Sequence, residues 1–357
     1  MIPVTKTFLP PIEEYIEYLE KIWNSNQVTN NGPLVLELEE KLKDFLGVNH
    51  LFFVSNGTIA LQIAIKALDL KGEIITTPFS YVATTSSIVW EGCKPVFTDI
   101  DSNTLCINPD LIEEAITPET SAILATHVYG IPCDVEKIQS IAQKYNLKVI
   151  YDAAHTFGVK YKDKSMVSYG DISTLSFHAT KIFHTVEGGA IITQEDEIAH
   201  RISYMRNFGH KGQEEFWGLG INGKNSEFHA AMGLCNLNYL NEIISKRMEI
   251  SQLYDDQLIR SGIQRLDIPE RTAYNFAYYP IILKNENNLI LIKKILNNYE
   301  IYPRRYFFPS LDKLPYVRGE NIKVSNEISK KVLCLPLYPG LNYDQVKTIS
   351  EIINNNQ

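Results

Sequence analysis

Short apolar runs alternate with amphipathic stretches along the chain from His50 to about Thr193. The runs have the length of buried strands, whereas the stretches between them repeat apolar residues at helical spacing. This alternation predicts an α/β fold with right-handed crossovers and a mostly parallel central sheet between two layers of helices. The predicted strands are Leu51–Val54, Glu73–Thr77, Pro95–Thr98, Ala122–Thr126, Lys148–Tyr151, Thr174–Phe177 and Ala190–Thr193, and the predicted helices are Ile59–Leu68, Tyr81–Trp90 and Val135–Tyr145.

The region after this alternating pattern predicts a second, smaller domain. Apolar residues at helical spacing run from Ala230 to Tyr254, which predicts one long helix that joins the two parts. The length of 357 residues is sufficient for two domains. We predict a large domain over residues 1–240 and a small C-terminal α/β domain over residues 241–357. Further predicted elements are helix Leu34–Leu46, strand Tyr279–Ile282 and helix Asn288–Asn298.

Charge and composition exclude several classes of protein. The chain has 34 basic and 42 acidic residues, and the net charge of −8 argues against a nucleic-acid-binding protein. Backbone N–H groups can still hold a small anion. We find neither the roughly 18 consecutive apolar residues of a membrane helix nor an apolar signal core. The five cysteines form no Cys-x-x-Cys pair. We therefore expect reduced thiols, no zinc site and a cytoplasmic location.

The first candidate for chemistry is the segment Ser55-Asn56-Gly57-Thr58, which follows a predicted strand and precedes a predicted helix. Gly57 would allow a tight turn of the backbone. The free N–H groups of the helix start, together with the Thr58 hydroxyl, would form a seat for an anion. The alternative is an ordinary helix cap.

The second candidate is Asp152, at the end of the apolar strand before Ala153. A carboxylate in such a place is poorly solvated and needs a partner, and a cationic partner would keep it ionised. The alternative is a cap on the next segment. His155 comes three residues later and would face the same way, or it is a structural histidine.

The third candidate is Lys181, which lies between the strand that ends near Ser176 and the glycine pair Gly188-Gly189. Apolar neighbours would desolvate the amine, lower its pKa and make it a nucleophile. The alternative is an exposed loop lysine. The fourth candidate is Tyr81, whose ring offers a flat face to a planar ligand or belongs to the core.

Together the four candidates describe one ligand, a planar pyridine ring that carries a phosphate and an aldehyde. The helix start at Gly57 would bind the phosphate, and Tyr81 would stack on the ring. Asp152 would keep the ring nitrogen protonated, while Lys181 would form a Schiff base with the aldehyde. This combination indicates pyridoxal 5'-phosphate (PLP) chemistry.

With these residues the sequence resembles the DegT/DnrJ/EryC1/StrS family of sugar aminotransferases, which are PLP enzymes of the aspartate-aminotransferase fold (fold type I). The resemblance extends over nearly the whole chain. It is carried by Val28–Leu46, Ser55–Leu61, Thr77–Thr84, Tyr151–Gly158, Ser176–Gly189, Gly220–Gly233, Arg304–Pro309 and Lys331–Pro336.

The resemblance implies a role for each matching residue. It also implies a homodimer with shared active sites, because an Asn from the neighbouring subunit reaches the phosphate in this family. The implied roles are catalysis by Lys181, pairing of Asp152 with the ring nitrogen, His155 near the ring hydroxyl, phosphate binding by Gly57, Thr58, Ser176 and the partner-facing Asn222, and stacking by Tyr81.

The motif His178-Ala179-Thr180-Lys181 with Glu187-Gly188-Gly189 is similar to members that act at the sugar C4 position. The implied reaction converts dTDP-4-keto-6-deoxyglucose into dTDP-4-amino-4,6-dideoxyglucose with L-glutamate as amino donor. It implies a place in O-antigen or other surface-polysaccharide synthesis. The alternatives are a 3-keto sugar, a UDP or GDP sugar, and a non-catalytic regulator.

Some positions depart from the family pattern, which leaves the substrate contacts open. Gly223 and Lys224 stand where an aromatic residue and an Arg are usual, and Asn225 replaces a common Met. Ile182-Phe183-His184 follows the lysine where many members have Asn. Further candidates for substrate contact are His184, His229 and Arg206.

Overall fold

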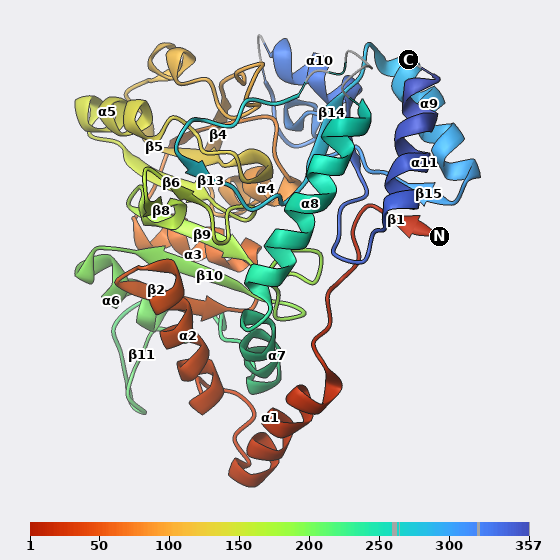
Figure 1. Cartoon of the computed structure of the whole chain (residues 1–357). Coiled ribbons are helices and arrows are strands. Elements are labelled where there is room, and N and C mark those ends of the chain that lie inside the picture. Colours follow the sequence, from red (N-terminus) through yellow and green to blue (C-terminus); the bar gives the residue numbers. More distant parts are fainter. Residues whose placement is uncertain (259–262, 264, 320–321, 357) are drawn as a thin grey trace.

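The computed structural model describes residues 1–258, 263, 265–319 and 322–356. Its centre is a seven-stranded sheet with the strand order β2-β10-β9-β6-β5-β3-β4 (Figure 1). β10 runs antiparallel to both of its neighbours and the other pairs are parallel, which confirms the predicted mostly parallel sheet. The strands are β2 (His50–Val54), β3 (Glu73–Thr76), β4 (Lys94–Phe97), β5 (Thr120–Thr126), β6 (Lys148–Asp152), β9 (Ile172–Ser176) and β10 (Gly189–Thr193).

Helices cover both faces of this sheet, because successive side chains of a strand point to opposite faces. In β6, Val149 and Tyr151 belong to a core cluster with α5, whereas Ile150 belongs to the cluster with α3 on the other face. The helices of the first face are α2 (Pro33–Leu46), α5 (Val135–Tyr145) and α7 (Glu227–Leu237), and those of the second are α3 (Gly57–Ala67), α4 (Val82–Trp90) and α6 (Asp196–Met205).

The single long helix expected from Ala230 to Tyr254 is wrong, because the chain forms α7 and then α8 (Leu240–Leu258). Between them the N–H of Asn238 bonds to the Cys235 carbonyl, and the N–H of Tyr239 bonds to the Asn236 carbonyl. These tight bonds across three residues end the α-helix. The hydrophobic spacing continues through the break, so the periodicity alone does not reveal it.

A smaller α/β part surrounds the second half of α8, at the right of Figure 1. The first residues of the chain pack with it, since β1 pairs in parallel with β15. The division into residues 1–240 and 241–357 stays a prediction. The elements are β14 (Tyr279–Ile282), antiparallel to β16 (Val332–Leu335), β1 (Ile2–Pro3), β15 (Ile301–Tyr302), α9 (Glu286–Asn298), α10 (Val324–Lys331) and α11 (Tyr343–Asn354).

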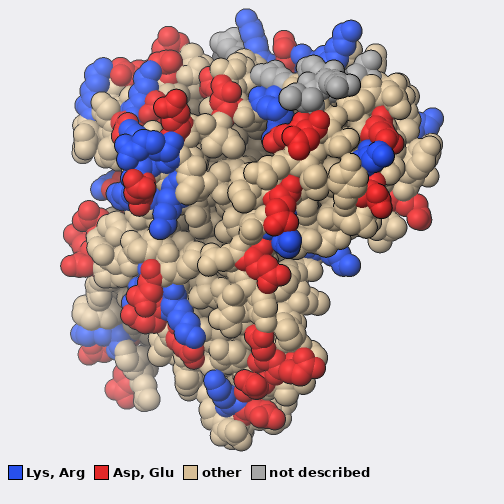
Figure 2. Space-filling view, viewed as in Figure 1, with Lys and Arg blue, Asp and Glu red and all other residues tan. Residues whose placement is uncertain are grey.

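One further α-helix and several short strands lie largely at the surface. Acidic and basic side chains are interspersed over the face shown in Figure 2. Among the described residues, none of the helices is long and apolar enough to cross a membrane. The surface elements are α1 (Ile12–Ser25), β7 (Lys160–Tyr161), β8 (Lys164–Ser165), β11 (His210–Lys211), β12 (Glu215–Phe216) and β13 (Thr272–Ala273).

A side chain from α7 caps the start of α2. Pro33, the first residue of α2, has no N–H, and the next two N–H groups, of Leu34 and Val35, donate to the buried carboxylate of Glu227 at 2.7 and 3.1 Å. Negative charge at a helix N-terminus interacts favourably with the helix dipole. Glu227, the first residue of α7, therefore connects the start of α7 to the start of α2.

We expect Glu227→Gln to lower the free energy of unfolding by about 1–2 kcal/mol, because an amide has one acceptor oxygen and its NH₂ would face a backbone N–H. Chemical denaturation measures the change. The control is Glu37→Gln, which alters an exposed ion pair with Lys41 on the same helix and should cost less than about 0.5 kcal/mol. Equal losses in both variants would contradict the capping role.

Candidate active site

Seven of the eight predicted site residues come together at one edge of the sheet. The carboxyl ends of parallel strands share an edge, and the loops there hold ligands in open α/β folds. The ends of β2, β3, β6 and β9 are followed here by short loops or helix starts. The residues that these ends bring together are Gly57, Thr58, Tyr81, Asp152, His155, Ser176 and Lys181.

The start of α3 forms an anion seat at the end of β2. The Asn56 side chain accepts the N–H of Ile59 at 2.9 Å. Gly57 and Thr58 are the two residues before Ile59. The described chain provides no acceptor for their N–H groups. The Thr58 hydroxyl is on the same turn and is exposed. Two free N–H groups at a helix N-terminus and a hydroxyl suit a phosphate.

Gly57 matters for a different reason than the tight turn expected from the sequence, since its φ is not positive. A Cβ on Gly57 would lie 3.1 Å from the Cβ and 3.5 Å from the Oγ of Ser176. The absence of a side chain therefore brings the Ser176 hydroxyl next to the start of α3. Gly189 also allows a close approach to the start of α3, because a Cβ there would lie 2.6 Å from the carbonyl carbon of Asn56.

Asp152 is the last residue of β6 and is 6% exposed. Its carboxylate accepts the Thr84 hydroxyl at 2.7 Å and the Ala154 N–H at 3.2 Å. Burial raises the pKa of Asp152, while these two hydrogen bonds and the attraction of Lys181 oppose the rise. A cationic group against this carboxylate would keep it ionised.

Lys181 lies in the loop that connects β9 to β10. The loop is closed at its base by hydrogen bonds between the N–H of Phe177 and the Gly188 carbonyl at 2.8 Å, and between the N–H of Thr185 and the Phe177 carbonyl at 2.9 Å. Burial lowers the pKa of Lys181 from 10.5 to about 8, although Asp152 and Tyr81 attract the ammonium form. The neutral amine, which can attack a carbonyl, is therefore far more abundant near physiological pH than in an ordinary lysine.

In the cofactor-free protein we expect the Lys181 amine to reach half of its maximal reactivity toward acetic anhydride at about pH 8. Burial disfavours the proton, so the neutral, reactive amine appears at lower pH than in an ordinary lysine. Trace labelling across a pH series with mass spectrometry measures this. The control in the same tube is Nα-acetyl-lysine, whose free side-chain amine has an ordinary pKa of about 10.4. Half-maximal labelling of Lys181 at the control's pH would contradict the prediction.

His155 has a fixed tautomer. The backbone N–H of Tyr129 donates to Nδ1 of His155 at 3.1 Å, and burial lowers the pKa of this histidine well below its ordinary value. The ring is therefore neutral, and its single proton is on Nε2. The ring stacks on Phe307 with 5.9 Å between centroids and 4° between planes. His155 thus presents one N–H donor from a rigid ring.

Tyr81 and Asn222 are exposed, but only Tyr81 lies with the other predicted site residues. Tyr81 immediately precedes α4, is 60% exposed and interacts electrostatically with Lys181. Asn222 is exposed in the loop before α7 and forms a β-bridge with Asn207. In the described part of the chain it has no hydrogen bond or ion pair with the other seven residues. That Asn222 contacts the phosphate in a neighbouring subunit stays a prediction.

The three further candidates for substrate contact have internal partners. Arg206 is buried and pairs with the Glu39 carboxylate. His184 donates from Nε2 to the Phe8 carbonyl at 2.6 Å, and His229 bonds to the Ser226 hydroxyl at 2.7 Å. His184 therefore connects the N-terminal segment to the lysine loop, as does the hydroxyl of Thr7, which donates to the Ala179 carbonyl at 3.0 Å.

Sequence reasoning missed several residues of this site. Thr84 holds Asp152 and lies within a segment that carries the resemblance, so its place three residues after Tyr81 is a usable signal. Asn275 donates to the carbonyls of His155 and Phe157 at 2.9 and 3.0 Å. Tyr278 lines the pocket of Lys181. Asn275 and Tyr278 reach the site only through tertiary packing, and no local pattern marks them.

This geometry can be compared with known proteins. The model of the DegT/DnrJ/EryC1/StrS aminotransferase family matches residues 11–354. The chain belongs to this family. It is an aminotransferase, and the family and enzyme class predicted from the sequence are confirmed.

Relatives and solved structures are similar over the full chain. A dTDP-4-amino-4,6-dideoxy-D-glucose transaminase of Shigella dysenteriae is 48% identical over 98% of both chains. A protein of the same name from Escherichia coli is 42% identical over 99% of this chain and 98% of its own. DesI, solved in the presence of its TDP-sugar product, has a TM-score of 0.94 and 29% identity, over 99% of this chain and 92% of that chain. The predicted fold is thereby confirmed.

Proposed function

We propose that this aminotransferase uses PLP to transfer the amino group of L-glutamate to dTDP-4-keto-6-deoxy-D-glucose. The products would be dTDP-4-amino-4,6-dideoxy-D-glucose and 2-oxoglutarate. The observation that carries the chemistry is the desolvated amine of Lys181, which interacts electrostatically with the buried carboxylate of Asp152. The choice of sugar is supported by two relatives named for this amino sugar, which align along almost their whole length.

The residues at the sheet edge fit PLP. The free N–H groups of Gly57 and Thr58 and the nearby Ser176 hydroxyl suit its phosphate. In the described chain, the carboxylate of Asp152 has hydrogen bonds from neutral donors only, so it suits a protonated ring nitrogen. When bound, PLP supplies an aldehyde for a lysine and a ring that takes up electrons from the amino donor.

The residues of this chain then have distinct tasks. The Lys181 amine would remove the α-proton of the amino donor and later return a proton to the sugar carbon. Asp152 would hold the ring nitrogen protonated through its negative charge. The N–H on Nε2 of His155 would donate to the ring hydroxyl, and Tyr81 would cover one face of the ring. These tasks follow the placements described above and are part of the proposal.

The proposal includes a homodimer in which Asn222 of one subunit reaches the phosphate in the other. It also includes a cytoplasmic location and a role in making amino sugars for surface polysaccharides such as O-antigen. These three parts rest on the resemblance to the family. Separated monomers should accordingly be inactive.

A product assay tests the proposal. Purified protein is mixed with PLP, L-glutamate and dTDP-4-keto-6-deoxyglucose, and the sugar is identified by mass spectrometry and NMR. An equatorial amine at C4 is the expected result. If glutamate converts the bound cofactor to its amine form but no amino sugar appears, the amino donor is right and the sugar is wrong. If glutamate leaves the cofactor spectrum unchanged, the proposed function fails.

A further inference from the structure

Arg247 of α8 is a buried cation without a carboxylate partner among the described residues. The residue is 5% exposed, and its Nε donates to the Phe276 carbonyl at 2.8 Å. One of its Nη atoms donates to the Ala277 carbonyl at 2.6 Å. Burial lowers the pKa of Arg247 to about 10. Two carbonyl oxygens leave the charge of a guanidinium uncompensated, and buried charges are normally paired.

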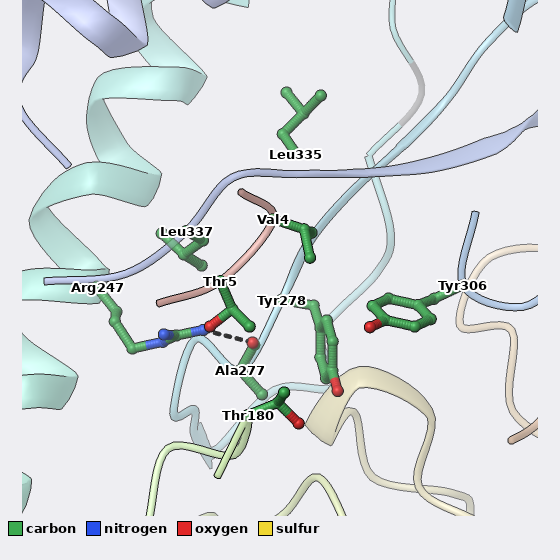
Figure 3. A pocket seen from close by; sticks show the side chains of 9 residues that line it. All are labelled: Val4, Thr5, Thr180, Arg247, Ala277, Tyr278, Tyr306, Leu335 and Leu337. Carbon is green, nitrogen blue, oxygen red and sulfur yellow. Dashed lines mark hydrogen bonds between the residues drawn. The ribbon is translucent and has the colours of Figure 1, made fainter. Parts of the chain in front are cut away.

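The side chain of Arg247 lines a small pocket next to the pocket that Lys181 lines. Figure 3 shows Arg247 extending from α8 toward Thr5 of the N-terminal segment, with Thr180 and Tyr278 on the other side. The neighbouring pocket is lined by Lys181, and the two pockets share Thr180, Ala277 and Tyr278. Arg247 thus lines a pocket that adjoins the pocket of the Lys181 amine.

We propose that Arg247 receives the distal carboxylate of a dicarboxylic amino donor, which makes glutamate the preferred donor. This inference rests on the proposed function. The α-carbon of the donor must lie at the Lys181 amine, so its α-carboxylate stays in the lysine pocket. The distal carboxylate extends further, and the neighbouring pocket offers a guanidinium there. An Arg fork binds a carboxylate through charge-assisted hydrogen bonds.

Arg247→Gln tests the inference by removing the charge and keeping an amide that can still donate to a backbone carbonyl. We expect the KM for L-glutamate to rise about tenfold or more, with the KM for the keto sugar unchanged. Isothermal titration with glutarate, a dicarboxylate without an amine, should show a similar loss of affinity in the PLP-loaded protein. The matched control is Arg305→Gln, because Arg305 already pairs with Glu286 at 2.9 Å and lies outside the pocket.

A folded Arg247→Gln variant with wild-type affinity for glutarate and wild-type KM for glutamate would overturn the inference. An equal loss with both substrates would also overturn it, because a purely structural role affects both half-reactions. If the variant does not fold, the wild-type enzyme gives the answer with L-norvaline, which has the same carbon chain without the distal carboxylate. Norvaline should react at least about tenfold less efficiently, and equal efficiency would refute the inference. If glutamate itself fails to react, the proposed function is wrong, and glutarate binding still tests Arg247.

Discussion

Replacing Lys181 with alanine is expected to abolish transamination, with a loss of roughly 10⁴-fold or more in kcat. In the proposed mechanism, Lys181→Ala removes the nucleophile that would attach the cofactor and also the base that would move the α-proton. The fold should persist, since the substitution removes a desolvated amine from the interior. Steady-state production of the amino sugar measures the loss. Borohydride reduction followed by mass spectrometry should find cofactor on the Lys181 peptide of the wild type and none in the variant.

A matched control separates this effect from a general loss of positive charge. Lys164 is exposed on β8, over the ring of Tyr169 and away from the sheet edge that holds the site. Lys164→Ala should keep wild-type activity. Measurable steady-state transamination by purified Lys181→Ala protein would overturn the assignment of the catalytic lysine.

The strand ends explain why so much of this site could be predicted from the sequence. In a parallel sheet, residues that follow different strands converge on one edge regardless of their separation along the chain. Ser176 and the start of α3 therefore meet, although more than one hundred residues separate Gly57 from Ser176. The periodicity of apolar residues located those strand ends to within one or two residues, because each strand is buried on both faces.

The rest of the site depends on packing between distant parts of the chain. Tyr278 and Arg247 come from the segments after α7, and no spacing in the sequence relates them to Lys181. The two-residue strand β1 is too short to leave a hydrophobic pattern, yet it ties the N-terminus to β15. Asn222 has its predicted task in another subunit, so a single chain carries no contact that would reveal it.

The site also shows how burial acts on two groups in opposite directions. Desolvation lowers the pKa of Lys181 and raises that of Asp152, because it disfavours the charged form of each. The attraction between them partly opposes both shifts. A lysine that is easily neutral suits a nucleophile, whereas the carboxylate needs a cation to stay ionised. A protonated ring nitrogen at Asp152 would provide that cation and leave Lys181 free to lose its proton.

We therefore expect Asp152→Asn to lower kcat by about 10²- to 10⁴-fold, because a neutral amide cannot hold the ring nitrogen protonated. The side chain keeps its size, and its oxygen can still accept the Thr84 hydroxyl, so the fold should remain. Loss of the α-proton should become rate-limiting, which a larger kinetic isotope effect with α-deuterated glutamate would report. PLP methylated at the ring nitrogen carries a fixed positive charge and should restore part of the rate.

Asp171 provides the control, since it precedes β9 at the opposite edge of the sheet. Its carboxylate accepts the Lys148 ammonium at 3.0 Å and the Val149 N–H at 2.8 Å. Asp171→Asn removes a charge of the same sign from the same sheet, and should leave kcat and the isotope effect unchanged. Wild-type kcat in Asp152→Asn would show that the charge of this carboxylate does not drive the reaction. A loss that the methylated cofactor does not relieve would instead place its contribution in the geometry of the site, because a fixed charge replaces only the electrostatic part.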